Sequence, residues 1–294
     1  EHLYKLFKKF NLNQEASGFL ARLRTLGPKV ATELKPITVS SEIPQKELQE
    51  YLDAMTSGTL ENTLVRMAFR YTPNREEAEK QVFDYSKDTL FIHLVTSQIQ
   101  DEKGRVLATI GSLEEDLDGH IVHRISQNLS LSSLFLRWTI EKCVERHGLD
   151  SENIIKFIEP SPVVDENRIL LIREGLNAYF NKNYIVAIHL LIPQIEETIR
   201  NLVEISGGIV LKPSRSGGYH LKTFDELLRD NIVKESLGED IANYFQILFT
   251  DQRGWNLRNN VCHGLVNPKM LDYQAADRVI HAFLCIGLLR TKGN

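Results

Sequence analysis

The sequence predicts a mainly α-helical protein, with a helical bundle over residues 161–294 and a mainly helical region over residues 1–160. Apolar residues recur at helical spacing along most of the chain, which favours amphipathic helices over strands. A hydrophobic content of 42% in 294 residues is enough for a well-buried core. One stretch, residues 89–110, is instead rich in β-forming residues around a turn-like segment.

Within the N-terminal region, three segments have apolar side chains every three or four residues and are predicted to be helices: Phe19 to Leu26, Leu48 to Met55, and Leu60 to Ala68. Residues 89–96 and 105–110 flank Asp101-Glu102-Lys103-Gly104, a pattern that predicts a small β-hairpin near residues 89–110. A long apolar stripe from Ile121 to Arg146 indicates one long helix.

The clearest punctuation is Pro160-Ser161-Pro162, because the residue before each proline resists helix; we place the domain boundary there. Pro193 lies within the second helix predicted after this boundary, residues 184–205, and either kinks that helix or splits it in two. The Gly- and Ser-rich residues 206–218 are expected to form a flexible loop. The predicted C-terminal helices span residues 165–180, 184–205, 223–229, 240–249, 256–265 and 273–289.

Composition excludes several classes of protein. A net charge of −4 does not suit a protein that coats nucleic acid along its whole surface. Three cysteines without a C-x-x-C pair indicate neither a disulfide framework nor a zinc site, and no apolar run approaches the roughly 20 residues of a membrane span. We therefore expect a cytoplasmic protein without membrane contact, metal or cofactor. The opening residues read like the middle of a helix, which indicates a fragment of a longer protein.

The strongest chemical pattern is RNNVCHG, from Arg258 to Gly264, where a cation, two amides and a histidine lie within six positions. With Asn256 as the helix cap, Arg258 and Asn259 would lie in the first turn, where free N–H groups attract an anion. Arg258 and His263 are five residues apart and would diverge by about 140° on a regular helix. Either the long arginine wraps around the helix, or a second copy supplies the missing group.

Plainer interpretations of the same residues stay open. An arginine and an asparagine at a helix start are most often a cap and a surface charge, and a histidine before glycine is commonly a helix end. Glu196 and Arg200, at i and i+4, form either a surface ion pair or part of the site. The basic loop residues Lys212, Arg215 and Lys222 suit either an RNA backbone or a solvated loop.

The segment from Asn256 to Gly264, which follows the helical segment Leu191 to Arg200, resembles the HEPN (higher eukaryotes and prokaryotes nucleotide-binding) superfamily. More narrowly, it is similar to an uncharacterised branch that shares an L-R-N-x-x-x-H-G ending. HEPN domains are helical bundles that commonly dimerise. Many are metal-independent endoribonucleases, with an arginine and a histidine four to six residues later forming a composite site between protomers.

The resemblance implies that Arg258 and His263 are catalytic, and that Asn259 is the polar residue that often follows the arginine. His263 would assist proton transfer, Arg258 would neutralise the phosphate, and Asn259 would orient it. Attack by the ribose 2′-oxygen would leave a 2′,3′-cyclic phosphate, so RNA is the expected partner, within a homodimer. A defence or toxin-like role, and a regulatory partner or missing flanking domain, fit this picture. The alternative is a non-catalytic module for dimerisation or for nucleotide or RNA binding.

Overall fold

The structure is a computed structural model that describes residues 2–33, 42–88, 95–101, 103–215 and 217–290. Helices dominate, and the strands of the described residues form two small antiparallel hairpins, which confirms the predicted mainly α fold. The chain divides into two compact units, residues 1–42 with 86–120, and residues 43–85 with 121–294. The boundary expected at residue 160 lies inside the second unit, where Ser161 is buried and donates a hydrogen bond to the carbonyl of Ile286.

The first unit contains a pair of helices and a β-hairpin. Helices α1 (His2–Lys9) and α2 (Asn13–Glu33) pack against each other, with the rings of Phe7 and Phe19 5.1 Å apart. Strands β1 (Ser97–Gln100) and β2 (Val106–Ile110) pair antiparallel, so the first strand begins later than predicted. Residues 89–94 of that prediction lie outside the described residues.

The hairpin turn of the first unit is organised by one carboxylate. Asp101 accepts hydrogen bonds from the backbone N–H groups of Lys103 and Arg105, and from the Arg105 side chain at 2.6 Å. These bonds lower the pKa of Asp101, although its partial burial opposes them. The turn predicted from the Asp-Glu-Lys-Gly sequence is therefore where it was expected.

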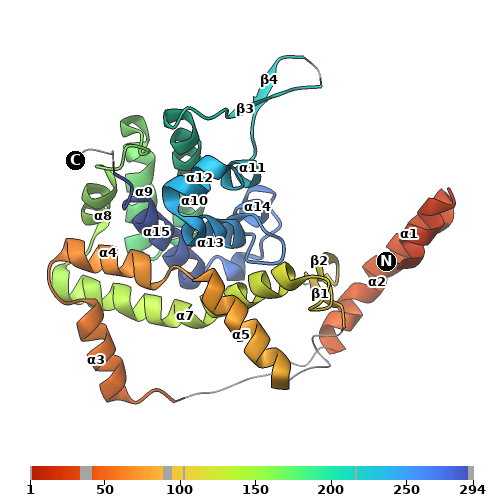
Figure 1. Ribbon diagram of the computed structural model, residues 1–294, viewed down its shortest axis with the longest axis horizontal. Coiled ribbons are helices and arrows are strands. Elements are labelled where there is room, and N and C mark those ends of the chain that lie inside the picture. Colours follow the sequence, from red (N-terminus) through yellow and green to blue (C-terminus); the bar gives the residue numbers. More distant parts are fainter. Residues whose placement is uncertain (1, 34–41, 89–94, 102, 216, 291–294) are drawn as a thin grey trace. The chain divides into compact units, whose positions relative to one another are not determined.

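The second unit is a helical bundle arranged around its C-terminal helix α15 (Tyr273–Ile286), which is buried along its length and packs against α4, α8, α10 and α13 (Figure 1). The predicted helix over residues 121–146 is confirmed as most of α7 (Leu117–His147). The first residues of α7, 117–120, and the last residues of α5 (Arg75–Asp88), 86–88, belong to the first unit. In the described residues no helix has both the length and the apolar character to cross a membrane. The other helices are α3 (Gln45–Met55), α4 (Leu60–Arg70), α5 (Arg75–Asp88), α7 (Leu117–His147), α8 (Ser151–Ile158), α9 (Ile169–Phe180), α10 (Tyr184–Ile205), α11 (Phe224–Leu228), α12 (Asn231–Leu237), α13 (Glu239–Phe249) and α14 (Leu257–Cys262), with short 3-10 turns at Glu166–Arg168 and Pro268–Met270.

Helices α9 and α10 form a close antiparallel pair joined by a short turn, in which Asn183 caps α10 by accepting a hydrogen bond from the N–H of Val186. A Cβ atom at Gly175 would lie 2.6 Å from the side chain of Leu191, so only glycine permits this approach. Pro193 lies inside α10 without splitting it. Helix α10 therefore runs without interruption from Tyr184 to Ile205.

Residues 206–218, expected from their glycines and serines to form a flexible loop, contribute a short strand and a turn to a small β-hairpin. Strands β3 (Leu211–Pro213) and β4 (Tyr219–Leu221) pair antiparallel, and the hairpin extends away from α10 and α11 (Figure 1). Gly217 and Gly218 both have positive φ, which allows the chain to reverse. The expectation did not include this pairing, because glycines and serines indicate a turn but do not show that the flanking residues 211–213 and 219–221 pair as strands.

A buried carboxylate lies where α7, α9 and α15 meet. Asp277 is fully buried, and its Oδ1 accepts a hydrogen bond from Tyr179 at 2.6 Å and lies 3.0 Å from Nη2 of Arg137. Its Oδ2 is buried without a hydrogen-bond partner among the described residues. Burial raises the pKa of Asp277 to about 7, and the charges of Arg137 and Arg278 only partly oppose this.

This carboxylate makes stability fall with rising pH. The folded protein holds the Asp277 proton up to a pKa of about 7, whereas the unfolded chain loses it near 3.8. The contribution of the Asp277 proton to the free energy of unfolding is thus complete below pH 3.8. It is lost as pH rises to 7, by up to about 1.4 kcal/mol per pH unit. We expect Asp277→Asn to gain stability relative to wild type across this window, measured by urea unfolding at several pH values.

His281 also makes stability depend on pH, in the opposite direction, because burial lowers the pKa of its ring to about 3. Wild type and Asp277→Asn both contain His281, so its contribution cancels when the two are compared. A difference between wild type and Asp277→Asn that stays constant from pH 4 to pH 7 would contradict the raised pKa of Asp277.

Candidate functional site

Helix α14, which carries the RNNVCHG pattern, is held by a tight turn at the end of α13. The N–H of Trp255 donates a hydrogen bond to the carbonyl of Ile247 at 2.9 Å, folding the chain back onto α13. A Cβ atom at Gly254 would lie 2.4 Å from that same carbonyl oxygen, so the turn requires glycine. Leu257 and Val261 are buried on one face of α14, as expected for core residues. The turn thereby fixes the direction in which Arg258 leaves the helix.

Asn256 precedes α14, but its side chain does not cap the helix. Its backbone is left-handed, with φ 50° and ψ 32°, whereas capping asparagines usually have extended backbones. The Oδ1 atom of Asn256 instead accepts a hydrogen bond from Nδ2 of Asn259 at 2.8 Å, and that nitrogen also donates to the carbonyl of Thr250 at 3.3 Å. The expectation of an Asn256 cap was therefore wrong, and Asn259 ties the start of α14 to the preceding turn.

Arg258 is held in a two-pronged ion pair with Glu196 of α10. Its Nε lies 2.9 Å from Oε2 of Glu196, and its Nη2 lies 3.3 Å from Oε1. The remaining Nη1 donates to Oδ1 of Asn259 at 3.2 Å. The side chains of Arg258 and Glu196 are 22% and 14% exposed, so the pair is largely buried yet reachable from solvent. This geometry orients the guanidinium through all three of its nitrogen atoms.

The same carboxylate belongs to a larger group of charges on α10. Nη2 of Arg200 donates to Oε1 of Glu196 at 3.1 Å, and Nη1 of Arg200 pairs with Glu197. Glu197 in turn lies 3.8 Å from Arg168, at the start of α9. We call Arg168, Glu196, Glu197, Arg200 and Arg258 the arginine–glutamate cluster. With three arginines and two glutamates, the cluster carries a net charge of +1.

His263 follows Cys262 at the C-terminal end of α14, and both residues are exposed. Among the described residues, no hydrogen bond joins the imidazole of His263 to Arg258, either directly or through a third side chain. Although Cys262 is exposed as a residue, partial desolvation of its thiol raises the pKa of that group; the charge of Arg258 opposes this rise and that of Glu196 adds to it. Cys262 is thus a neutral thiol beside the cluster, and its exposure differs from the buried position favoured for cysteine.

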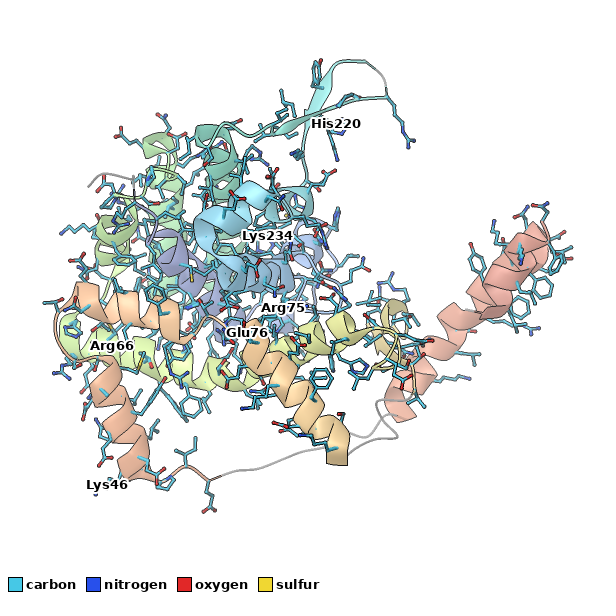
Figure 2. All side chains as sticks on the ribbon, in the orientation of Figure 1. Lys46, Arg66, Arg75, Glu76, His220 and Lys234 are labelled. Atoms are coloured by element: carbon cyan, nitrogen blue, oxygen red, sulfur yellow. The ribbon has the colours of Figure 1, made fainter. Side chains whose placement is uncertain are left out.

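The basic residues expected on the 206–218 loop lie on the β3–β4 hairpin and beside it, and two of them are already paired. Lys212 contacts both carboxylate oxygens of Glu226 at 2.5 Å, and Lys222 contacts Asp230 at 3.1 Å. Arg215 is exposed at the hairpin tip, and His220 lies on β4 (Figure 2). Among the described residues, no hydrogen bond or ion pair joins this hairpin to the cluster.

The structure brings together Arg258, Asn259, Glu196 and Arg200 from the residues singled out in the sequence, and leaves Lys212, Arg215 and Lys222 apart from them. Two members of the cluster were not anticipated. Glu197 lies three residues before Arg200, a spacing that favours an ion pair and that the sequence does show. Arg168 comes from another helix, and no local pattern signals its position.

Neither a protein-family model, nor a curated protein, nor a solved structure matches the chain. Within the described ranges, no three histidine, cysteine, aspartate or glutamate side chains converge as they would to hold a metal ion. The candidate site therefore consists of the arginine–glutamate cluster, with His263 exposed at the end of α14.

The amide of Asn259 should be essential to the turn, and we expect Asn259→Asp to lower stability by about 1–3 kcal/mol. The change keeps the size of the side chain but replaces the nitrogen that donates to Thr250 and Asn256 with an acceptor. Urea unfolding measures the difference. Gln252→Glu makes the same chemical change at an exposed position of the same turn and should be nearly neutral. Equal effects of the two substitutions would contradict the structural role of Asn259.

Proposed function

We propose that this protein is a metal-independent endoribonuclease that acts as a homodimer, with Arg258 and His263 as its catalytic residues. The observation that carries the proposal is the pairing of an oriented, partly exposed guanidinium with an exposed histidine at the end of the same short helix. Phosphodiester cleavage requires a cation and a proton-transfer group at the same phosphate, and Arg258 and His263 supply one group of each kind. The L-R-N-x-x-x-H-G resemblance to HEPN domains supports the same assignment.

In the proposed reaction the ribose 2′-oxygen attacks the adjacent phosphorus. One P–O bond forms, the bond to the 5′-oxygen breaks, and the products are a 2′,3′-cyclic phosphate and a 5′-hydroxyl. His263 assists the transfer of a proton from the 2′-hydroxyl or to the leaving 5′-oxygen. Arg258 neutralises the negative charge that gathers on the phosphoryl oxygens. DNA lacks the attacking hydroxyl and is not cleaved.

Asn259 has a different part in this proposal from the one expected from the sequence. Both hydrogen bonds donated by its amide nitrogen are already made within the turn, and its oxygen accepts from Arg258. Asn259 therefore orients Arg258, which in turn meets the phosphate.

A homodimer answers the geometric difficulty of the site. Arg258 lies in the first turn of α14 and turns towards Glu196, whereas His263 follows the last residue of the helix. A second copy related by a two-fold axis would place its own His263 opposite Arg258, so that each site draws on both chains.

One observation favours the alternative, a non-catalytic module for dimerisation or for nucleotide or RNA binding. Arg258 already has a carboxylate partner in Glu196, and such a partner competes with a phosphate for the guanidinium. Only an activity measurement separates a restrained catalytic arginine from a purely structural one.

The test is cleavage of single-stranded RNA in EDTA by the wild type, Arg258→Ala and His263→Ala. We expect cleavage by the wild type with 2′,3′-cyclic phosphate ends, and a loss of at least about 100-fold in each variant. Mixed in equal amounts, the two inactive variants should recover about a quarter of wild-type activity, because half of the dimers are mixed and each holds one intact composite site.

Urea unfolding of both variants serves as the folding control. Unchanged cleavage by both variants would refute the site. Loss of activity without recovery on mixing would refute the composite arrangement. RNA binding without cleavage by the wild type would establish the non-catalytic alternative.

A further inference from the structure

Glu196 is shared unequally between two arginines. Among the described residues, its Oε2 accepts a hydrogen bond only from Nε of Arg258, at 2.9 Å, while its Oε1 accepts from Nη2 of both Arg258 and Arg200, at 3.3 Å and 3.1 Å. Arg258 thus binds the carboxylate with the Nε–Nη2 edge of its guanidinium. Arg200 contacts the carboxylate through only one nitrogen, Nη2, of the corresponding edge of its own guanidinium.

The other nitrogen on that edge of Arg200 is an unused donor. Nε of Arg200 is buried and has no hydrogen-bond partner among the described residues. An unpaired buried donor is unfavourable, and a charged one especially so. Because Nε and Nη2 of an arginine point in the same direction, this edge matches the two oxygens of a carboxylate. Arg200 is therefore equipped to bind both oxygens of Glu196.

We propose that Glu196 is handed from Arg258 to Arg200 when a phosphodiester of RNA binds, which releases Arg258 for the phosphate. The inference rests on the proposed function and makes Glu196 and Arg200 positioning residues of that site. Oε1 stays on Nη2 of Arg200, while Oε2 exchanges Nε of Arg258 for Nε of Arg200. No bond or proton is transferred in this exchange.

The charges of the arginine–glutamate cluster fit such an exchange. Arg168, Arg200 and Arg258 oppose Glu196 and Glu197, leaving one positive charge that a single phosphodiester would neutralise. A largely buried carboxylate deprived of its only cation would be strongly destabilising. Glu196 retains Arg200 throughout, so release of Arg258 does not leave a buried negative charge unpaired.

The handover predicts an unusual dependence of RNA binding on Arg200. Without Arg200, Glu196 has Arg258 as its only close cation and holds it more tightly, so RNA affinity should fall although Arg200 does not touch RNA. Without the carboxylate of Glu196, there is no competitor for Arg258, and Arg200 should cease to matter. A direct RNA contact or a purely structural role of Arg200 would instead weaken binding in both backgrounds.

The experiment measures the dissociation constant of a fluorescent 2′-O-methyl oligoribonucleotide, which resembles RNA but lacks the attacking hydroxyl, by anisotropy. The proteins compared are wild type, Arg200→Met, Glu196→Gln and the double variant. We expect Arg200→Met to weaken binding at least about fivefold and Glu196→Gln to strengthen it, with little effect of Arg200→Met once residue 196 is glutamine. Equal weakening by Arg200→Met in both backgrounds overturns the handover, as does weaker binding by Glu196→Gln.

Arg173→Met is the matched control, because Arg173 also pairs with a glutamate, Glu152, in the same unit but outside the cluster. It should bind like wild type. If Arg200→Met does not fold, Arg200→Lys replaces it in both backgrounds, since lysine keeps the charge but loses the two-nitrogen edge.

The proposed function is judged separately, by cleavage of unmodified RNA. Binding that follows the predicted pattern without cleavage supports the handover and refutes the nuclease. Cleavage with equal effects of Arg200→Met in both backgrounds supports the nuclease and refutes the handover. Absence of binding by the wild type refutes the handover, and absence of cleavage of unmodified RNA refutes the nuclease.

Discussion

The carboxylate of Glu196 holds together the parts of the candidate site, because it contacts Arg200 on its own helix and Arg258 on α14. These side chains are largely buried, where charges interact strongly and an unpaired charge is costly. The pairing therefore fixes where Arg258 points while leaving it next to solvent. Whether Arg258 can meet a phosphate depends on how firmly this one carboxylate retains it.

Packing elsewhere in the second unit makes that contact possible. Gly175 lets α9 approach α10, and Gly254 lets the turn after α13 fold against the carbonyl of Ile247. Asn259 then secures the start of α14 through the carbonyl of Thr250 and the side chain of Asn256. Each of these contacts is local, yet together they bring Arg258 to a carboxylate 62 residues earlier in the chain.

Helical periodicity was sufficient to predict the mainly α fold, and α7, α10 and α15 lie close to where it placed them. The composition of residues 206–218 predicted a loop but did not show that residues 211–213 pair with 219–221, and no pattern predicted the left-handed backbone of Asn256. The Glu196–Arg200 spacing indicated an ion pair, but the sequence could not show that the same carboxylate reaches Arg258. That contact is tertiary, as is the contribution of Arg168, and helical spacing informs only on neighbours within one helix.

The exchange of Glu196 between Arg258 and Arg200 is tested most directly on the arginine side chains themselves, by NMR of their Nε–H groups, assigned with Arg258→Lys and Arg200→Lys. The signals are compared in the free protein and with the 2′-O-methyl oligoribonucleotide. If RNA binding moves Glu196 from Arg258 to Arg200, the Arg258 and Arg200 signals change together, and the Nε–H of Arg200 becomes more protected from solvent exchange as it binds Glu196. RNA binding that leaves both signals unchanged, or that changes Arg258 while Arg200 stays as in the free protein, would contradict this exchange.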